Sequence, residues 1–575
     1  MRTLPFDKPL RLGSQQVFAE RRADGAILLR AQAALGEYPR KITEKLEHWA
    51  ARAPERILFA QRDATGGWRS VTYAQALAQA RSIGGFLLKK HLSAERPLLV
   101  LSGNDIEHAL LHLGAMYVGV PYAPISPAYS LLSTDLARLR FIRDLLTPGL
   151  VFANGPQYRP ALAVCKGIEI LERFSDAQGS SEEAQQAHEQ VGPDTIAKFL
   201  FTSGSTGEPK AVINTQRMWC ANQAMIASMF AFFREEPPVI VDWAPWHHTA
   251  AGNHDLGLVL YNGGSYYIDA GKPLPGAIET TVSNLREIAP TWYFNVPKGY
   301  EALLPYLRSD ETLRRNFFSR LSVLWFAGAA MTQHVFDDMK ALAYQARGAS
   351  IPFLTGLGST ETAPYAMGRM WETEDASNMG LPPPGQEMKL VPIAGKLEAR
   401  LKGPNITPGY WRQPALTAAA FDEEGYYRLG DAFVLADPDD PQKGLLFRGR
   451  IAEDFKLATG TWVHVGPLRA RFIEHFAPLV RDVVLAGEGR SELAALIFPS
   501  GNVERAQLAK RLRSFSEGST GSSSRIARAI VLEEPPSLDG GEMTDKGSIN
   551  QRAVLSRRAA VVEELYSASA KVLLA

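Results

Sequence analysis

Cysteine is almost absent from this chain of 575 residues, which contains only Cys165 and Cys220. Two cysteines so far apart argue against a disulfide framework and against a cysteine-rich zinc site. Long apolar runs are also missing, because His, Gly and Pro interrupt the most apolar stretch, HALLHLGAMYVGVPYAPI, which favours a buried segment over a membrane span. The first residues lack the apolar core of a secretory signal. These absences predict a cytoplasmic protein in a reducing compartment, with no membrane partner.

A strong net charge is missing as well. The chain has 62 basic and 61 acidic residues, and its formal charge is +1. No global field therefore favours nucleic acid or an anionic membrane surface. We expect a small-molecule partner, and we expect a chain of this length to form about three or four compact units.

The first two thirds of the chain alternate helical and strand patterns. The stretch KITEKLEHWAARAPE spaces its apolar residues as an amphipathic helix does, whereas RPLLVLSGND, PGLVFAN, PPVIVDW, GGSYYID and RLSVLWFAG are short apolar runs that end near turn residues. This pattern predicts an α/β fold with layered α/β subdomains. Several of these runs end near Gly or Asp, where the loops at strand ends can build a site.

The pattern changes near residue 390. The stretch GKLEARLKG alternates apolar and charged residues, as a half-exposed strand does, and indicates a β-rich subdomain. After FRGR a further segment with its own strands and helix begins. We place a domain boundary between Gly449 and Arg450, which predicts a large N-terminal domain over residues 1–449 and a small, mobile α+β C-terminal domain over residues 450–575.

The stretch FLFTSGSTGEPKAVINT, residues 199–215, concentrates glycine and hydroxyl residues between two strand patterns. It predicts strand, loop and strand. A Walker-type loop is disfavoured because Pro209 precedes Lys210 and Ala211 follows it. Glycines permit close backbone approach, so we expect a polyphosphate ligand, with a flexible Ser/Gly hairpin as the alternative. The donors suited to phosphate oxygens are Thr202, Ser203, Ser205, Thr206 and Lys210.

Four strings occur in a fixed order: TSGSTGEPK, GLGSTETAP, YYRLGD and FRGRIAEDFK. They resemble motifs of the adenylate-forming superfamily, which comprises acyl-CoA synthetases, adenylation domains and luciferases, and the resemblance covers nearly the whole chain. It implies a two-step reaction in which ATP, with Mg²⁺, adenylates a carboxylic acid before acyl transfer. Because the carboxylate and the α-phosphate are both anions, the site must supply positive charge and oriented donors.

The resemblance implies roles for the residues of these motifs. Glu361 would bind Mg²⁺, Thr360 would donate to the α-phosphate, and Asp431 would accept the ribose hydroxyls, with Arg450 also reaching the nucleotide. Taken alone, the Thr-Glu pair is typical of a helix N-terminus. Leu357 stands where many relatives have an aromatic residue against the adenine. The resemblance also implies nucleotide-binding roles for Gly204, Gly207, Gly328, Ala329, Ala330, Gly358 and Ser359.

The segment DWAPWHHTAAGNHDLGLVLYNGGSYYI resembles the acyl motif of the family. Its His248 would lie near the acyl carboxylate and gate the acyl and thiol tunnels. Adjacent His247 and His248 with His254 could suggest a metal cluster, but neighbouring rings point apart and Asp255 is the one acidic residue nearby, so we disfavour it. A flat slot for a planar ring could be lined by Trp246, Thr249, Asn253, Gly328 and Ala329.

The C-terminal motif, MTDKGSINQR, departs from the family pattern. Ser548 stands at the position of the usual catalytic lysine, and Lys546 lies two residues earlier. An extended segment would point both to the same side, so Lys546 is our candidate for the lysine that bridges carboxylate and ATP, against a solvent-facing lysine as the alternative. Lys456 matches a lysine that turns toward the site when the small domain rotates. The hinge also departs from the family pattern, because Ala452 stands where many relatives have Asp or Lys. We therefore expect a pivot shifted by one residue.

Three longer strings, YPRKITEKLEHWAARAPER, DWAPWHHTAAGNHDLGLVLYNGGSYYIDAGKP and TDKGSINQRAVL, are similar to feruloyl-CoA synthetases. This implies that a hydroxycinnamate such as ferulate, p-coumarate or caffeate is joined to coenzyme A, with a homodimer as the assembly we consider. Other acids, such as benzoate or a medium-chain fatty acid, are alternatives, as are a luciferase-like oxygenase and a catalytically silent nucleotide-binding protein. Amino-acid adenylation is disfavoured, because HHTAAGN offers no Asp for an ammonium group.

Overall fold

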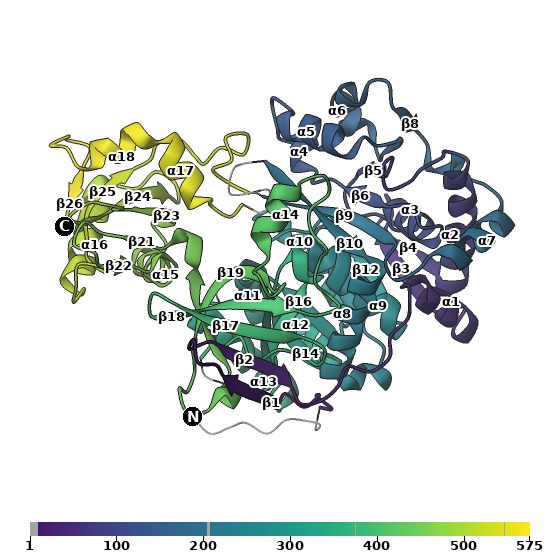
Figure 1. The fold of residues 1–575 in the computed structure, drawn as a ribbon, viewed down its shortest axis with the longest axis horizontal. Helices are drawn as coiled ribbons and strands as arrows, with labels where there is room; N and C mark the ends of the chain where they lie inside the picture. Colours follow the sequence, from purple (N-terminus) through teal and green to yellow (C-terminus); the bar gives the residue numbers. More distant parts are fainter. Residues whose placement is uncertain (1–9, 204–207, 330, 374, 545–546) are drawn as a thin grey trace.

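The computed structural model describes residues 10–203, 208–329, 331–373, 375–544 and 547–575. Figure 1 shows a larger body built from the chain up to about residue 450 and a smaller body, coloured yellow-green to yellow, beside it. Both bodies combine helices and sheets. The predicted fold class, α/β with a large and a small part, is therefore confirmed.

The first sheet of the large body is mixed, with strand order β10-β9-β6-β5-β7-β8. All neighbours are parallel except β9 and β10, which form an antiparallel hairpin. Leu98 and Val100 face one buried core and Leu99 and Leu101 face another, because successive residues of a strand point to opposite faces. Its strands are β5 (Leu98–Leu101), β6 (Tyr122–Pro124), β7 (Leu150–Ala153), β8 (Glu169–Leu171), β9 (Ile196–Ser203) and β10 (Pro209–Thr215).

Two four-stranded sheets lie next to it. Their orders are β11-β12-β3-β4 and β13-β14-β15-β16, and in each an antiparallel strand closes one edge of a parallel set. The strands are β3 (Ile57–Arg62), β4 (Trp68–Thr72), β11 (Val239–Asp242), β12 (Ser265–Ile268), β13 (Trp292–Asn295), β14 (Val323–Phe326), β15 (Phe353–Gly358) and β16 (Tyr365–Arg369). One continuous core joins these sheets to the first, through Phe59, Val100 and Trp292 among others.

The β-rich part expected near residue 390 is a fully antiparallel six-stranded sheet with order β1-β2-β17-β18-β19-β20. The chain's first strands complete it, which the local pattern did not indicate. The strands are β1 (Val17–Arg21), β2 (Ile27–Ala31), β17 (Glu387–Ile393), β18 (Lys396–Lys402), β19 (Tyr427–Leu435) and β20 (Leu445–Arg450).

The small body has its own core, which contains Phe472, Leu485 and Leu508. A two-stranded sheet precedes a four-stranded one with order β23-β24-β25-β26. The strands are β21 (Phe455–Lys456), β22 (Trp462–Val463), β23 (Val480–Ala486), β24 (Leu493–Pro499), β25 (Ile526–Val531) and β26 (Leu573–Leu574). The helices are α15 (Val465–Phe476), α16 (Arg505–Glu517), α17 (Gln551–Arg557) and α18 (Ala559–Leu565).

Helices of the large body begin at polar caps. Asp105 accepts from the backbone N–H of His108 at the start of α3, and Thr215 accepts from that of Met218 at the start of α8, which satisfies donors that a helix end leaves free. These helices are α1 (Thr43–Arg52), α2 (Tyr73–Leu88), α3 (Ile106–Tyr117), α4 (Ala128–Leu131), α5 (Ala137–Leu146), α6 (Arg159–Leu162), α7 (Ser181–Gln190), α8 (Gln216–Met229), α9 (Leu256–Asn262), α10 (Ile278–Glu287), α11 (Pro297–Ser309), α12 (Glu311–Ser319), α13 (Gln333–Arg347) and α14 (Pro414–Ala420).

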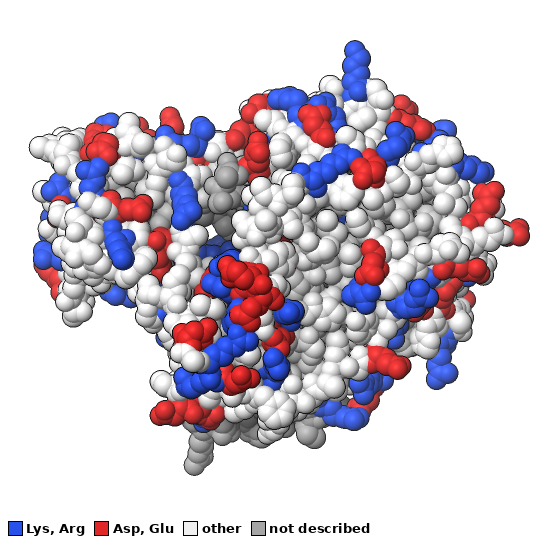
Figure 2. All heavy atoms as spheres, viewed as in Figure 1, with Lys and Arg blue, Asp and Glu red and all other residues white. Residues whose placement is uncertain are grey.

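The surface agrees with the near-zero net charge. Figure 2 shows Lys and Arg side chains interspersed with Asp and Glu side chains over both bodies. Among the described residues, no helix combines the length and the apolar character that crossing a membrane requires.

Candidate active site

The β9–β10 hairpin carries the predicted phosphate loop. Its register pairs Thr202 with Lys210 and Ser203 with Pro209, so the two strands converge on the loop from both sides. The predicted arrangement of strand, loop and strand is confirmed for its two strands, β9 extending through Thr202 and Ser203. The predicted residues Gly204, Ser205, Thr206 and Gly207 lie outside the described residues.

Tyr410 connects this hairpin to the predicted magnesium residue. The Tyr410 hydroxyl donates a hydrogen bond of 2.9 Å to Oε1 of Glu361, and the Lys210 Nζ lies 5.0 Å from the centre of the same ring. One phenol ring therefore brings the hairpin lysine and the buried Glu361 carboxylate, which are 151 residues apart in sequence, to the same place. Burial, together with the charge of Glu361, raises the pKa of Tyr410, so it stays a donor at neutral pH.

Backbone contacts hold Tyr410 in this position. The N–H of Thr407 donates to the carbonyl of Glu361 at 2.9 Å, and the N–H of Trp411 donates to the carbonyl of Ala211 in β10 at 2.8 Å. The segment around Tyr410 is thus fastened both to the hairpin and to the turn that carries Glu361. The sequence motifs do not include Tyr410, although the string PGYW at residues 408–411 marks a turn followed by two aromatic residues.

Thr360 and Glu361 lie in a short 3₁₀ helix, Thr360–Thr362, directly after β15. Both side chains are buried. Gly358 precedes them, and a Cβ at this position would lie 1.7 Å from the carbonyl oxygen of Pro364, so only glycine fits. Ser359 starts the turn, and its N–H donates to Oγ1 of Thr362 at 2.9 Å. Leu357, at the predicted adenine position, is half-buried in β15.

Glu361 is the metal ligand that the sequence predicts. Among the described residues, no group of three or more His, Cys, Asp and Glu side chains converges as a protein-only metal site, including His247, His248 and His254. Mg²⁺ takes one or two protein carboxylates and completes its shell with phosphate oxygens and water. The buried Glu361, beside the hairpin that is predicted to bind phosphate, fits that requirement.

Asp431 and Arg450 face each other across β19 and β20. The Arg450 Nε lies 2.9 Å from Oδ1 of Asp431, whose side chain is 6% exposed. Burial raises the pKa of Asp431 to about 6, although the Arg450 charge opposes the shift. At pH 7 the carboxylate is therefore ionised and has two acceptor oxygens, as ribose hydroxyls require. Arg450 ends β20, where the polypeptide passes into the small body.

The acyl segment contains a π-helix, Ala250–Asp255, a form that often occurs at functional sites. Three neighbours hold its carbonyl groups. Lys198 Nζ donates to the Gly252 carbonyl at 2.9 Å, and the carbonyl of Asn253 accepts from Trp219 Nε1 at 2.7 Å and Gln223 Nε2 at 3.0 Å. The sequence gives no local sign of these donors, because they lie on β9 and α8.

The predicted acyl residues contact the surrounding elements. His248 accepts from the Gly252 N–H through its carbonyl, at 2.7 Å, so it is fixed to the π-helix. Asn253 donates to the side chain of Asn214 at 2.9 Å, and Thr249 is buried. Trp246 packs into the core and donates to the Tyr266 hydroxyl at 3.0 Å. These contacts favour supporting roles for Asn253 and Trp246 over the predicted contact with a substrate ring.

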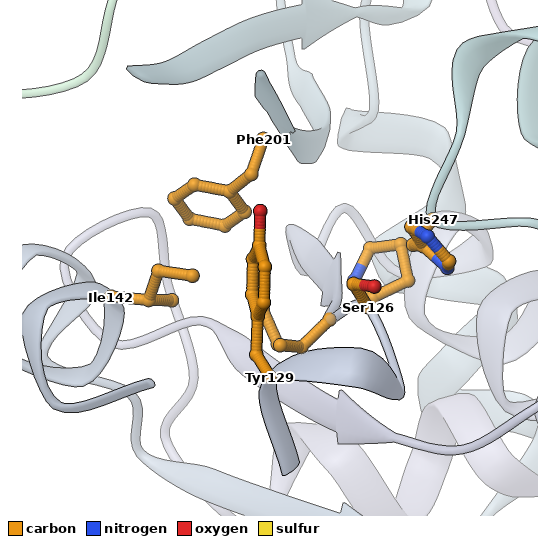
Figure 3. A pocket seen from close by; sticks show the side chains of 7 residues that line it. Ser126, Tyr129, Ile142, Phe201 and His247 are labelled. Atoms are coloured by element: carbon orange, nitrogen blue, oxygen red, sulfur yellow. The ribbon is translucent and has the colours of Figure 1, made fainter. Parts of the chain in front are cut away.

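A small pocket opens between the hairpin and the acyl segment (Figure 3). Phe201 precedes the phosphate loop on β9, and His247 precedes His248, so the pocket joins the two predicted halves of the site. The Tyr129 side chain points between them. The pocket is lined by Pro124, Ile125, Ser126, Tyr129, Ile142, Phe201 and His247.

Gly328 and Ala329 follow β14. Gly328 has a φ of +86°. Residues other than glycine rarely adopt this backbone angle, so the turn depends on Gly328. Both residues lie close in sequence to Trp325, whose ring belongs to the central core. Ala330 lies outside the described residues.

The small body supplies the remaining predicted residues. Lys456, on β21, is exposed, and its Nζ lies 5.0 Å from the Trp462 ring of β22. Lys546 lies outside the described residues. The described residues on either side of it are joined by hydrogen bonds: the N–H of Gly547 donates to the Thr544 carbonyl and the N–H of Thr544 to the Ser548 carbonyl, both at 2.9 Å.

Asp454 occupies the connection between the two bodies. Its Oδ2 pairs with Lys396 Nζ at 2.6 Å and with His464 Nδ1 at 2.9 Å, and its Oδ1 accepts from the N–H of Val465. Lys396 belongs to β18 of the large body, whereas His464 and Val465 begin the first helix of the small body. A second contact joins the bodies where Asp539 accepts from the N–H and hydroxyl of Thr134, at 3.0 and 2.8 Å.

The chain is 25% identical over 473 residues to a 3-hydroxybenzoate–CoA ligase from Aromatoleum sp. (strain CIB), a match that covers 76% of this chain and 82% of the relative. It is 24% identical over 421 residues to a carboxylic acid reductase from Segniliparus rugosus, which covers 66% of this chain and 33% of that protein. The chain thus spans about one third of the length of that relative.

A solved structure, ATP-bound MatB from Rhodopseudomonas palustris, matches with a TM-score of 0.70 and 18% identity, covering 91% of this chain and 100% of the other. These matches support the predicted use of ATP, Mg²⁺ and CoA. The family model described as AMP-binding enzyme matches residues 46–411, and its C-terminal domain matches residues 454–570. The first match alone covers more than half of the chain, so the chain belongs to the AMP-binding enzyme family.

Proposed function

We propose that the chain is an AMP-forming acid–CoA ligase for an aromatic acid, with a hydroxycinnamate such as ferulate, p-coumarate or caffeate as its substrate. The observation that carries the proposal is the contact set of Tyr410, which places Lys210 and Glu361 at one point beside the phosphate-binding hairpin. A relative named as a 3-hydroxybenzoate–CoA ligase supports an aromatic acid and CoA. The similarity of three sequence stretches to feruloyl-CoA synthetases supports the hydroxycinnamate.

In the first step a carboxylate oxygen of the acid attacks the α-phosphorus of ATP, and the bond to the pyrophosphate oxygen breaks. The products are an acyl-adenylate and pyrophosphate. Lys210 and the Thr202 hydroxyl, at the mouth of the hairpin, would bind the phosphates, and Thr360 would donate to the α-phosphate. Mg²⁺, held by Glu361, would offset the negative charge of the pyrophosphate group. Asp431 would fix the ribose, with Arg450 keeping it ionised at neutral pH.

In the second step the thiolate sulfur of CoA attacks the acyl carbon, and the bond to the AMP phosphate oxygen breaks. The thiol proton is released to solvent. His248, fixed by the π-helix, would separate the acyl and thiol paths. Lys456 rests against Trp462 in the small body, so we infer that this body rotates between the two steps to bring Lys456 to the site. Lys546 would serve the first step.

A panel of cinnamic, benzoic and fatty acids, assayed for CoA-dependent formation of AMP, tests the proposal. We expect hydroxycinnamates to give the highest kcat/KM, and we expect ATP plus acid without CoA to give enzyme-bound acyl-adenylate. A higher kcat/KM for medium-chain fatty acids would reject the substrate assignment. If no acid stimulates the release of pyrophosphate, the chain is a nucleotide-binding protein without ligase activity.

A further inference from the structure

The π-helix ends in two buried titratable residues, His254 and Asp255. The His254 ring is 3% exposed, its Nδ1 lies 2.8 Å from Oδ1 of Asp255, and its Nε2 has no hydrogen-bond partner. Buried polar atoms are nearly always paired, because an unpaired one has given up its bond to water without replacement. The unpaired Nε2 therefore needs an explanation, and one explanation is that a bound ligand supplies its hydrogen-bond partner.

Aromatic side chains surround this ring. Trp325 lies nearly parallel to it, with ring centres 6.5 Å apart and planes at 12°, and Trp292 lies at 6.1 Å and 30°. The Phe294 ring is 5.6 Å away, and Tyr365 packs on Trp325 at 6.1 Å. We call His254, Trp292, Phe294, Trp325 and Tyr365 the aromatic cluster. Its members come from the π-helix and from β13, β14 and β16, so no local stretch of sequence reveals it.

Two glycines fix the far side of the aromatic cluster. Gly356 and Gly368 are cross-strand partners on β15 and β16. A Cβ on Gly356 would lie 2.5 Å from Cζ2 of Trp325, and one on Gly368 would lie 2.4 Å from the hydroxyl oxygen of Tyr365. Both rings therefore rest directly on the sheet, and the hydroxyl of Tyr365 is a second buried polar atom without a hydrogen-bond partner.

The aromatic cluster lies on the elements that carry the candidate active site. Trp325, in β14, is three residues before Gly328, and Tyr365 is four residues after Glu361. His254 is six residues after His248 and lies in the π-helix, whose Gly252 N–H donates to the His248 carbonyl.

Two buried carboxyl groups lie beside His254. Burial, with the neighbouring Asp255, raises the pKa of Asp242 well above its usual range, and burial likewise raises the pKa of Asp255. Asp242 also accepts from the Tyr266 hydroxyl at 2.6 Å. Burial lowers the pKa of His254 to about 4, which keeps the ring neutral. A neutral imidazole has one donor and one acceptor nitrogen, and Nδ1 is already paired with Asp255, so Nε2 can form one further hydrogen bond.

We propose that His254 Nε2 forms a hydrogen bond with a ring hydroxyl of the acid, and that this residue selects phenolic acids over acids without the hydroxyl. The inference rests on the proposed function and names the chemical group that the site reads. A site that loses a buried hydrogen bond discriminates more strongly than one that loses only apolar contact, because its polar atom stays unpaired with the wrong substrate. Asp255 and Asp242 act through His254 as positioning residues.

Three acids separate the hydrogen bond from ring size: 4-hydroxycinnamate, cinnamate and 4-methoxycinnamate. Acid-dependent exchange of pyrophosphate into ATP gives kcat/KM for each. For the unaltered chain we expect 4-hydroxycinnamate to exceed the other two by at least about tenfold. In His254→Phe we expect the ratio of 4-hydroxycinnamate to cinnamate to fall below about threefold, through loss on the hydroxylated acid alone. In His254→Gln, whose amide oxygen can accept, part of the ratio should return.

The matched control is His112→Phe. His112 is likewise a buried histidine whose ring nitrogens have no hydrogen-bond partner, but its ring stacks on Tyr122 and Trp219, outside the aromatic cluster. This variant should leave the ratio unchanged, and thermal unfolding with AMP binding checks that each variant folds. An unchanged ratio in His254→Phe, with hydroxycinnamates still accepted, would overturn this inference alone. Preference of the unaltered chain for fatty acids would overturn the proposed function, and this inference with it.

Discussion

At the scale of single residues, Tyr410 is the side chain on which the candidate active site depends most. Its ring meets Lys210 and its hydroxyl meets Glu361, so one residue contacts both the lysine that we propose to bind phosphate and the carboxylate that we propose to bind Mg²⁺. A hydrogen bond to a charged group contributes about 1.5–3 kcal/mol. The loss of this bond should therefore be visible in the first chemical step.

We predict that Tyr410→Phe slows acyl-adenylate formation by about tenfold and raises the Mg²⁺ concentration needed for half-maximal rate, because Glu361 loses the donor that orients it. Pyrophosphate exchange measured across a Mg²⁺ titration checks this. Tyr306→Phe is the control, since the Tyr306 hydroxyl donates to Glu279 at 2.7 Å on the surface. Equal behaviour of the two variants would refute the role of Tyr410.

Asp431 gives a pH prediction. Burial raises its pKa to about 6, so the carboxyl takes up a proton as pH falls through that value. A neutral carboxyl accepts ribose hydroxyls less well, and one pH unit below the pKa leaves about a tenth of the groups ionised. We therefore predict that AMP affinity falls by about tenfold between pH 7 and pH 5.

Calorimetric titration of AMP into the chain measures this profile. AMP titrates its own phosphate in the same range, so Asp431→Asn supplies the baseline: its affinity should be lower at pH 7 and should vary with pH only as the nucleotide does. Parallel profiles for the two proteins would show that Asp431 does not bind the ribose.

At the scale of elements, the π-helix Ala250–Asp255 joins the acyl segment to the core. Lys198, Trp219 and Gln223 donate to its carbonyl groups, and Gly252 has its Cα against the backbone of Trp246. A Cβ on Gly252 would lie 2.1 Å from the Trp246 carbonyl oxygen. The element is therefore positioned from several sides and has no room to shift.

We predict that Gly252→Ala lowers the free energy of unfolding by about 1–3 kcal/mol, the usual cost of forcing a methyl group into a packed site. It should also reduce kcat for acyl-adenylate formation, because His248 is bonded to the displaced turn. Urea unfolding and pyrophosphate exchange measure the two effects. Gly103→Ala is the control, since no atom lies within 4 Å of its added Cβ and its φ is not positive. If Gly103→Ala lowers the free energy of unfolding as much as Gly252→Ala does, the packing explanation is wrong.

Sequence alone predicts those parts of the site that are local. The hairpin of β9 and β10, the run of short buried strands and the Asp431 motif each show themselves within about fifteen residues. The contacts that assemble the site are not local: Tyr410 meets Glu361 over 49 residues, and His254 meets Trp325 over 71. Lys198 is the clearest case, because a lysine in a strand normally faces solvent, whereas this one is buried against a carbonyl that a different element supplies.

At the scale of the whole molecule, two sets of hydrogen bonds between described residues help to hold the small body against the large one. Asp454 binds Lys396 on one side and His464 on the other, close to Ala452, near which the sequence predicts a pivot shifted by one residue. Asp539 binds Thr134 in the stretch that precedes Lys546. We propose that this second contact belongs to the arrangement of the two bodies that performs the first step of the reaction.

We predict that Asp539→Ala slows acyl-adenylate formation by about fivefold and leaves thioester formation from preformed adenylate unchanged, because a surface hydrogen bond to a carboxylate is worth about 1 kcal/mol. Single-turnover assays of each step measure this. Asp144→Ala removes an exposed carboxylate of the large body that pairs with Arg143 and should change neither step. Equal slowing of both steps would argue against a state-specific contact.

The most direct test of the account is a crystal structure of the chain with ATP and Mg²⁺. We predict that the triphosphate lies along the hairpin from Ser203 to Lys210, with the metal between its oxygens and Glu361 and the ribose on Asp431. A triphosphate bound elsewhere on the molecule, with Lys210, Tyr410 and Glu361 left untouched, would contradict it.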